Sequence, residues 1–438
     1  MITYDAIVIG AGPNGLVAAN VLADAGWSVL VLESQPTAGG AVQTAEVTAP
    51  GFRNDMFSAF YPMTAASPVI DRLELGRHGL QWTHAPKVMA HPRGDGAAAI
   101  LDRDIDVTAA SLDAGEQGDG DSYRRLMESW MKVSEPLMAS LLNPFPPIVS
   151  AGRLVRAAGP AGLRELARLA LVPVRRFAEE HFAGEPARLL FAGNALHADL
   201  TPETAGSAVF GWLLVGLGQQ YGFPVPVGGA AGITDALVAR SVTRNVTLRC
   251  DAHVVRVVVD GGRVSGVVTS GGDHYRSRTV LADCDATKLF VDLVGQANLP
   301  AKFRERIGRI QRSSATFKVD WALSAPVPWT DPDVVGAGTV HVAETVDELT
   351  MTSAQLALGL VPDKPFLLIG QMTTADPTRS PPGTESMWAY THVPQQIRGD
   401  AGDQGIEGGQ NSKGEWSSSD AARFTERIEQ RIEALAPG

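Results

Sequence analysis

The hydrophobic pattern at the start of the chain predicts a βαβ unit. Residues 4–9 form a short apolar run that ends at a glycine turn, as expected for a buried parallel strand. Residues 14–25 place apolar side chains at helical spacing, and Gly26 ends the predicted helix. Residues 28–32 then form a second apolar run. A strand, a helix and a second strand within about thirty residues indicate parallel strands joined by a helical crossover.

The pattern changes twice further along the chain. Residues 113–122 are polar and rich in glycine, so we predict a loop there, followed by a mainly helical region from 123 to 183. Between residues 246 and 281 the apolar positions follow the pattern of strands, and Asp260-Gly261-Gly262 is a hairpin signal. Further strands are predicted at residues 279–282, 316–323 and 365–374, and a helix at 421–435.

The turn after the first predicted strand carries the clearest chemical signal. Gly10, Gly12 and Gly15 form a G-x-G-x-x-G pattern, with Pro13 inside it. Such glycine triplets also arise by chance, but this one directly follows a predicted strand and opens a predicted helix. The glycines allow a tight turn, close approach of the backbone to a pyrophosphate, and close packing of helix on strand. Since the helix N-terminus also attracts phosphates, the motif predicts a dinucleotide-binding site.

The residues after the second predicted strand narrow the choice of dinucleotide. Glu33 lies 18 residues after Gly15, where a carboxylate accepts hydrogen bonds from ribose hydroxyls and repels the 2′-phosphate of NADP. Ser34 follows it, and Gly39-Gly40 lies six residues past the acid. This second glycine pair resembles the extended motif of glutathione-reductase-type FAD oxidoreductases, in which it approaches the flavin pyrophosphate. We therefore predict FAD as the cofactor, with a plain NAD-binding module as the alternative.

Three further segments resemble a known family. They are residues 51–62 (GFRNDMFSAFYP), 226–237 (PVGGAAGITDAL) and 376–392 (DPTRSPPGTESMWAYTH). Together with the glycine motifs, they resemble the phytoene desaturase-like FAD-dependent oxidoreductases, and within them the pyridine nucleotide-disulfide oxidoreductase domain-containing protein 2 subgroup, along nearly the whole chain. The resemblance implies one FAD, an FAD domain assembled from separated pieces, and an apolar substrate chamber. It also implies that the backbone of Val254 contacts the adenine.

The patterns and the resemblance predict an α/β fold, in which a Rossmann-like FAD-binding domain of glutathione-reductase type is interleaved with a mixed α+β substrate domain. Residues 1–70 are expected to hold the FAD-binding βαβ unit, and 71–225 a mainly helical insertion of the substrate domain. Residues 226–300 would continue the FAD domain with a β-meander, and 301–438 would supply the substrate-domain sheet and a C-terminal helix. The predicted cofactor-binding residues are Gly10, Gly12, Pro13, Gly15, Glu33, Ser34, Gly39, Gly40 and Val254.

Two departures from the family pattern affect what we expect of the cofactor. Ala41 stands directly after the second glycine pair, where many relatives have an arginine. The relatives also continue past the position of Gly438 with a glycine-rich segment that closes over the flavin and completes the substrate chamber. If the chain lacks that segment, we expect weaker FAD binding and little turnover.

The charge, the cysteine count and the absence of long apolar stretches argue against several classes of function. The chain has 37 basic and 48 acidic residues, a net charge of −11, so no nucleic-acid partner is predicted. Its two cysteines, Cys250 and Cys284, are far apart, which excludes a CxxC redox pair and a zinc site built from local thiolate spacing. The N-terminus lacks the basic start of a signal peptide, and no apolar stretch approaches the ~20 residues of a membrane span. We therefore expect a cytoplasmic protein without a metal.

The sequence contains no evident acid–base constellation, so catalytic residues are not assigned. His197 and Asp199 follow an apolar helix and are interpreted as solvated or capping residues. The predicted function is an FAD-dependent, phytoene dehydrogenase-like oxidoreductase that oxidises or desaturates an apolar, isoprenoid- or lipid-like small molecule by hydride transfer to flavin N5. The alternatives are a flavin-binding or interaction protein without catalysis, and an amine oxidase-type flavoenzyme, whose expected C-terminal cysteine is absent.

A group of arginines lies on the apolar helices of the middle region. An ordinary solvated face is the simpler explanation, and a peripheral contact with a membrane that supplies lipid-like substrates is the alternative. The arginines are Arg153, Arg156, Arg164, Arg168, Arg175 and Arg176.

Overall fold

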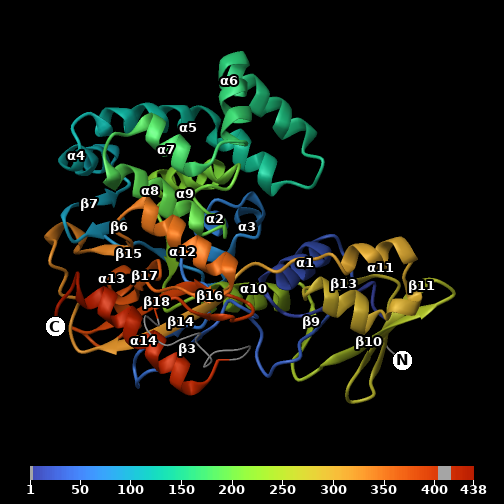
Figure 1. Ribbon diagram of the computed structural model, residues 1–438. Helices are drawn as coiled ribbons and strands as arrows, with labels where there is room; N and C mark the ends of the chain where they lie inside the picture. The colour runs from blue at the N-terminus through green and yellow to red at the C-terminus, as the bar shows by residue number, and fades with distance from the viewer. Residues whose placement is uncertain (1–2, 403–415) are drawn as a thin grey trace.

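The computed structural model describes residues 3–402 and 416–438, which form two lobes (Figure 1). One lobe holds a four-stranded parallel sheet in the order β13-β1-β2-β9. Every residue of its two central strands is buried, as expected for a sheet that is covered on both faces. The strands are β1 (Ala6–Ile9), β2 (Val29–Leu32), β9 (Thr247–Arg249) and β13 (Val280–Ala282). The predicted α/β class with a Rossmann-like parallel sheet is confirmed.

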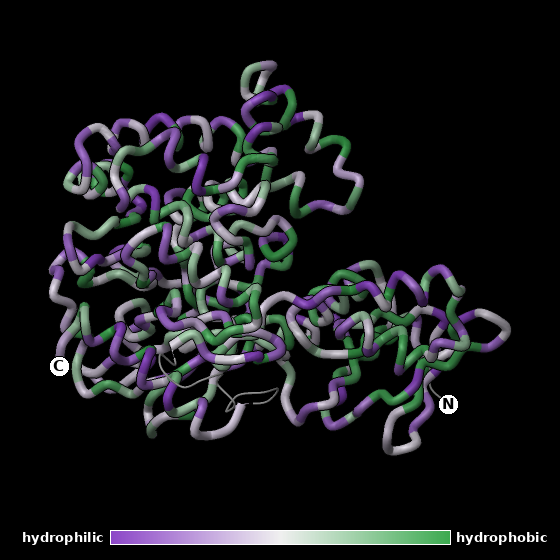
Figure 2. Tube along the Cα trace, in the orientation of Figure 1, coloured by the Kyte–Doolittle hydropathy of each residue, from purple (hydrophilic) through white to green (hydrophobic). Residues whose placement is uncertain are grey.

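Two layers cover the faces of this sheet. On one face, α1 (Pro13–Asp24) and α10 (Ala231–Thr243) share a core in which Leu16 packs with Leu237. On the other face lies an antiparallel meander that places Val257 against the central strands. Figure 2 shows hydrophobic segments concentrated in the interior of this lobe. The meander strands are β10 (Val254–Asp260), β11 (Arg263–Thr269) and β12 (His274–Arg276).

The hairpin predicted at Gly261-Gly262 joins β10 to β11. Asp260 pairs with Arg263, so the turn contains only the two glycines. Their φ angles are +57° and +77°, and a two-residue turn with positive φ at both positions matches the right-handed twist of the flanking strands. The glycines therefore set the pairing at the start of the β10–β11 hairpin, which shifts register further along, between Val258 and Val259.

The second lobe is built on a six-stranded mixed sheet in the order β14-β18-β17-β15-β6-β7. Only the β15–β6 pair is parallel among these neighbours. The strands are β6 (Lys87–Arg93), β7 (Gly96–Leu101), β14 (Ala315–Leu323), β15 (Ala337–Val342), β17 (Leu367–Gln371) and β18 (Glu385–Val393). One face packs on α14 (Ser418–Glu433) through Phe424 and Ile428.

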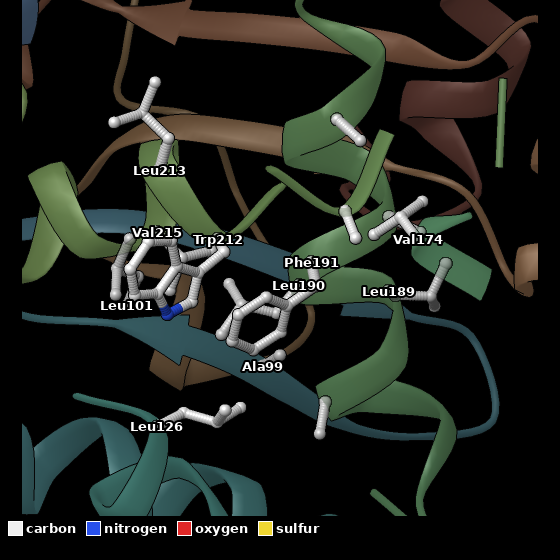
Figure 3. Packing of buried hydrophobic residues seen from close by; sticks show 14 of the residues in the cluster. Ala99, Leu101, Leu126, Val174, Leu189, Leu190, Phe191, Trp212, Leu213 and Val215 are labelled. Atoms are coloured by element: carbon white, nitrogen blue, oxygen red, sulfur yellow. The ribbon is translucent and has the colours of Figure 1, made fainter. Parts of the chain in front are cut away.

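A helical layer covers the other face of the six-stranded sheet (Figure 1). Within this layer Trp130 packs edge-on against Trp212, with ring centroids 5.0 Å apart. Trp212 and Phe191 lie in the same hydrophobic cluster (Figure 3). The layer consists of α4 (Ile105–Gly115), α5 (Asp119–Leu142), α6 (Ile148–Leu169), α7 (Val174–His181), α8 (Glu185–Leu196) and α9 (Ser207–Tyr221). None of the helices in the described ranges combines the length and apolar character that a membrane span needs.

Short elements connect the larger ones. Three two-stranded pairs are β3 (Thr44–Ala45) with β4 (Asn54–Asp55), β5 (Trp82–Thr83) with β8 (Val225–Pro226), and β16 (Leu360–Val361) with β19 (Gly399–Asp400). Further helices are α2 (Pro62–Ala65), α3 (Pro68–Arg72), α11 (Ala301–Ile307), α12 (Val346–Leu358) and α13 (Met372–Ala375). Turns of 3-10 or π geometry lie at Leu75–His78, Lys288–Leu293, Gln296–Asn298, Pro332–Val334 and Pro377–Arg379.

Two predicted elements differ from the structure. The loop expected at 113–122 is wrong over most of its length, because α4 reaches Gly115 and α5 begins at Asp119. The polar residues there satisfy the helix ends: the Asp113 carboxylate accepts from the N–H groups of Gly118 and Gly120, both at 2.9 Å. The strand predicted at 365–374 ends at Gln371, and α13 follows it directly.

Candidate dinucleotide site

The glycine loop lies at the carboxyl end of β1, where α1 begins. Gly10 adopts φ of +94°, a left-handed conformation that side chains disfavour. Gly12 is the N-cap of α1 and Pro13 is its first residue. A Cβ added at Gly15 would lie 2.3 Å from the carbonyl oxygen of Gly10, so only glycine allows the helix to start this close to the strand. The loop thus has the geometry that the motif predicts.

Glu33 lies at the end of β2 with a nearly buried side chain. Its Oε2 accepts a hydrogen bond from the Ala11 N–H at 2.7 Å, which joins it to the glycine loop. Its Oε1 accepts from the Gln35 N–H at 2.9 Å and from the Ser34 hydroxyl at 3.2 Å. Since all three neighbours are donors, the carboxylate acts as an acceptor beside the loop, as a ribose-binding acid must.

The second glycine pair packs directly on the first loop. The Gly39 N–H donates to the Ala11 carbonyl at 2.9 Å. A Cβ added at Gly40, whose φ is +55°, would lie 3.1 Å from the Gly12 Cα. Two stretches of backbone without side chains therefore meet at one place, and both are next to Glu33 through Ala11.

Val254 reaches the same edge of the sheet from the meander. It is the first residue of β10, and its side chain is buried. The segment just before it runs alongside Glu33, because the Ala252 N–H donates to the Glu33 carbonyl at 2.7 Å. The structure thus brings Gly10, Gly12, Pro13, Gly15, Glu33, Ser34, Gly39, Gly40 and the Val254 segment to one side of the parallel sheet.

Asp283 also lies at this edge, although the motifs did not identify it. It directly follows β13, and its N–H donates to the Ile9 carbonyl at 2.8 Å. Its Oδ2 accepts the Gly15 N–H at 3.0 Å. The signal that could have found it is its position right after a predicted parallel strand, because the carboxyl ends of parallel strands line the ligand crevice.

The three segments that resemble the family meet at a buried junction. Asp55 and Arg379 form an ion pair of 2.9 Å, with both side chains fully buried. The Asp55 Oδ1 also accepts from the Ala230 N–H at 2.8 Å. The Asp376 carboxylate accepts from the Gly228 N–H at 2.7 Å. Charged groups at this depth are retained only with partners, so the junction locks residues 51–62, 226–237 and 376–392 together.

A cavity of about 320 Å³ adjoins this junction. Thr44 lies in its lining and also donates to Asp55 at 2.8 Å. Arg53, Gly228 and Asp235 also line the cavity. Thr44 follows the second glycine pair by four residues, so the cavity lies a short distance along the chain from the dinucleotide loop.

The two polar residues noted after α8 lie elsewhere, against the six-stranded sheet. His197 is the C-cap residue of α8, and its Nε2 lies 2.9 Å from the Nε2 of His341 on β15. Asp199 pairs with His392 at 2.9 Å. Burial holds the pKa of His341 well below its usual value, so this ring is neutral at pH 7. The capping interpretation agrees with the position of His197, but both side chains have specific partners.

The fold and site together define a Rossmann-like scaffold of the dinucleotide-binding class. Residues 8–73 match the family of NAD(P)-binding Rossmann-like domains. The pyridine nucleotide-disulfide oxidoreductase domain-containing protein 2 of Mus musculus is 27% identical, over 99% of this chain and 79% of its own length. A phytoene desaturase of Fusarium fujikuroi is 23% identical, over 94% of this chain and 70% of its own. The resemblance to the phytoene desaturase-like oxidoreductases is therefore confirmed.

A solved structure supports the same fold. An oxidoreductase from Methanosarcina mazei aligns with a TM-score of 0.60 and 16% identity, over 99% of this chain and 85% of the other. At this identity the likeness describes the architecture alone. It supports the Rossmann-like fold, and the oxidoreductase class rests on the sequence relatives.

Proposed function

We propose that the protein is an FAD-dependent oxidoreductase that oxidises or desaturates an apolar small molecule. The observation that carries the proposal is the packing of Gly40 on Gly12, with Glu33 hydrogen-bonded to the same loop. An NAD-binding βαβ unit needs only the first loop and the acid. The second glycine pair adds a further surface of bare backbone, which suits the pyrophosphate of a flavin dinucleotide.

Each group of residues would hold a different part of FAD. The N-terminus of α1 and the backbone of Gly12 would face the pyrophosphate, because a helix N-terminus offers N–H groups to an anion and Gly12 itself has no side chain. Glu33 would accept hydrogen bonds from the adenosine ribose, and the backbone at Val254 would contact the adenine. When bound, the flavin would accept a hydride at N5 from a substrate C–H bond, and a second hydrogen would leave as a proton to water.

A competition titration tests the choice of cofactor. FAD is added to the purified protein, and binding is followed by the change in flavin fluorescence, with NAD⁺ and NADP⁺ as competitors. We expect saturable binding of one FAD per chain that neither competitor displaces at equal concentration. Preferential binding of NAD⁺ would contradict the proposal and support the NAD-binding alternative.

The substrate class rests on the relatives, one of which is a phytoene desaturase. Its test is anaerobic reduction of the FAD-loaded protein, followed by loss of the flavin absorbance band. We expect an isoprenoid hydrocarbon to bleach the band and a primary amine to leave it unchanged. Bleaching by the amine would support the amine oxidase alternative. No bleaching by either compound would contradict the proposed substrate class.

We also propose that the corner between α5 and α6 contacts a membrane surface of anionic lipids. α6 projects from the helical layer (Figure 1) and alternates between hydrophilic and hydrophobic segments (Figure 2). Phe145 and Ile148 are 92% and 74% exposed, with Leu141 and Val149 also exposed beside them. Insertion at a lipid surface would remove these apolar side chains from water.

The charges on α6 favour an anionic surface. The helix carries four arginines and one glutamate, in a chain whose net charge is −11. Arg168 pairs with Glu180, and Arg175 and Arg176 also pair with carboxylates, as on an ordinary solvated face. Within the described ranges no ion pair neutralises the other three, which are Arg153, Arg156 and Arg164. These three lie on the helix that projects.

Flotation with lipid vesicles tests this contact. We expect binding to vesicles that contain phosphatidylglycerol and little binding to pure phosphatidylcholine. The double variants Phe145→Ser/Ile148→Ser and Arg153→Gln/Arg156→Gln should both weaken it, whereas Arg176→Gln, on a paired arginine, should not. Absence of binding to the anionic vesicles, or binding unaffected by either double variant, would contradict the contact.

A further inference from the structure

We propose that the carboxylate of Asp283 competes with the FAD pyrophosphate for the N-terminus of α1 and thereby lowers the affinity of the site for FAD. The inference rests on the proposed FAD function and adds an affinity-determining residue to it. The first observation is the hydrogen bond from the Gly15 N–H to the Asp283 Oδ2, at 3.0 Å. Gly15 is the third residue of α1, where an anionic ligand would be bound.

Donors are scarce at this end of the helix. The first residue is Pro13, which has no N–H. The Leu16 N–H already donates to the Gly12 carbonyl at 2.9 Å. In the first turn of α1 this leaves Asn14 and Gly15 as N–H donors, and Asp283 takes the second of them. A pyrophosphate that binds at this end of the helix must share the Gly15 N–H with the carboxylate or displace the carboxylate from it.

The carboxylate also occupies the space that the glycine motif leaves open. A Cβ added at Gly12 would lie 2.4 Å from the Asp283 Oδ2. The absence of that side chain is what allows a pyrophosphate to approach the loop. The hydrogen bond from the Asp283 N–H to the Ile9 carbonyl, at 2.8 Å, continues the pairing of β13 with β1 and fixes the residue in this position.

The carboxylates of Asp283 and Asp285 differ in their ion-pair partners. Two residues further on, Asp285 pairs with Arg312 at 3.0 Å. In the part of the chain that the structure describes, no such ion pair involves Asp283. Two unneutralised anions at hydrogen-bond distance from the same donor repel each other, and the repulsion grows as water is excluded. The site therefore binds FAD less tightly than its backbone geometry would allow.

The substitution Asp283→Asn separates charge from shape. The asparagine oxygen can still accept the Gly15 N–H, but the negative charge is gone. We expect the dissociation constant of FAD to fall by roughly tenfold. The gain should shrink at high salt, because the Asp283 carboxylate is only partly buried and salt screens part of its repulsion. Asp283→Ala should also bind more tightly, since it removes the same charge. Asp285→Asn is the matched control and should bind like the unaltered protein.

The measurement is a fluorescence titration with FAD at low and high ionic strength, with circular dichroism to verify the fold of each variant. Tighter binding by both Asp283 variants and not by the Asp285 variant supports the inference. If the unaltered protein binds FAD and the Asp283 variants bind it equally or more weakly, the inference is overturned while the proposed function stands. If none of these proteins binds FAD, both the proposed function and the inference are overturned.

Discussion

Asp55 and Arg379 form a fully buried ion pair, 2.9 Å long, between two segments that lie far apart in the sequence. The guanidinium of Arg379 also donates to the Arg53 carbonyl at 3.0 Å, and the Arg53 N–H donates back to the Arg379 carbonyl at 2.8 Å. The pair therefore fixes two backbone segments to each other as well as two charges. Because Asp55 also accepts from Ala230, the relationship links the nucleotide lobe to the six-stranded lobe.

The first prediction concerns this pair. Arg379→Met should lower the free energy of unfolding by about 3–5 kcal/mol, because it leaves Asp55 buried without its partner. Urea unfolding measures the change. The control is Arg77→Met, which removes an exposed ion pair with Glu74 and should cost less than about 1 kcal/mol. Equal stability of the two variants would show that the buried pair does not hold the junction.

The second prediction concerns the acid at the end of β2. Glu33→Ala should weaken FAD binding by about 1–3 kcal/mol, the cost of leaving buried polar groups without an acceptor. Part of the loss would come from the Ala11 N–H, because it donates to Glu33 in the unaltered protein and would lose this acceptor in the variant. Glu33→Gln keeps an acceptor oxygen. Isothermal titration calorimetry should therefore show an affinity for FAD between those of the unaltered protein and Glu33→Ala. FAD binding that is unchanged in Glu33→Ala would place the ribose elsewhere.

The third prediction is a pH dependence of stability that arises from His91. Its ring is completely buried on β6, and burial lowers its pKa to about 4. The unfolded chain, with an ordinary histidine pKa near 6.5, binds a proton that the folded chain does not, so stability falls as pH falls from about 6.5 towards 4. This residue alone should cost about 2 kcal/mol between about pH 7.5 and pH 5.

Unfolding by urea at a series of pH values measures this slope. His91→Leu should flatten it over the same window, because the unfolded chain then binds one proton fewer. The variant also removes a hydrogen bond between the ring Nε2 and the Ala343 carbonyl, so the comparison concerns the slope and not the absolute stability. An identical slope in the two proteins would contradict the assignment.

The local parts of the site could be predicted from the sequence, and the distant parts could not. The glycine loop, Glu33 and the second glycine pair lie within about thirty residues. They belong to a motif whose residue types and spacing follow from the backbone geometry of the βαβ unit. Asp283 reaches the same loop from a strand far along the chain, and its role depends on which strand pairs with β1. The Asp55–Arg379 pair likewise depends on tertiary packing, for which a single sequence contains no spacing rule.

Helix ends explain the main error in the prediction of local structure. Asp and Gly residues at 113–122 resemble a loop, but the same residue types also cap helices. The Asp119 carboxylate, for example, accepts from the N–H groups of Ala183 and Gly184, at 2.9 and 2.8 Å. Those donors lie more than sixty residues away, beyond the reach of local pattern analysis.

The claim that FAD binds at the glycine loop is tested most directly by an absorption spectrum. The protein and its Gly12→Val variant are incubated with excess FAD and desalted before the spectrum is recorded. A valine side chain would fill the space at the pyrophosphate, whereas Gly152→Val, at an exposed helical position with open space around it, is the control. We predict flavin bands in the unaltered protein and in Gly152→Val, and none in a folded Gly12→Val. Equal flavin content in Gly12→Val and the unaltered protein would contradict the account.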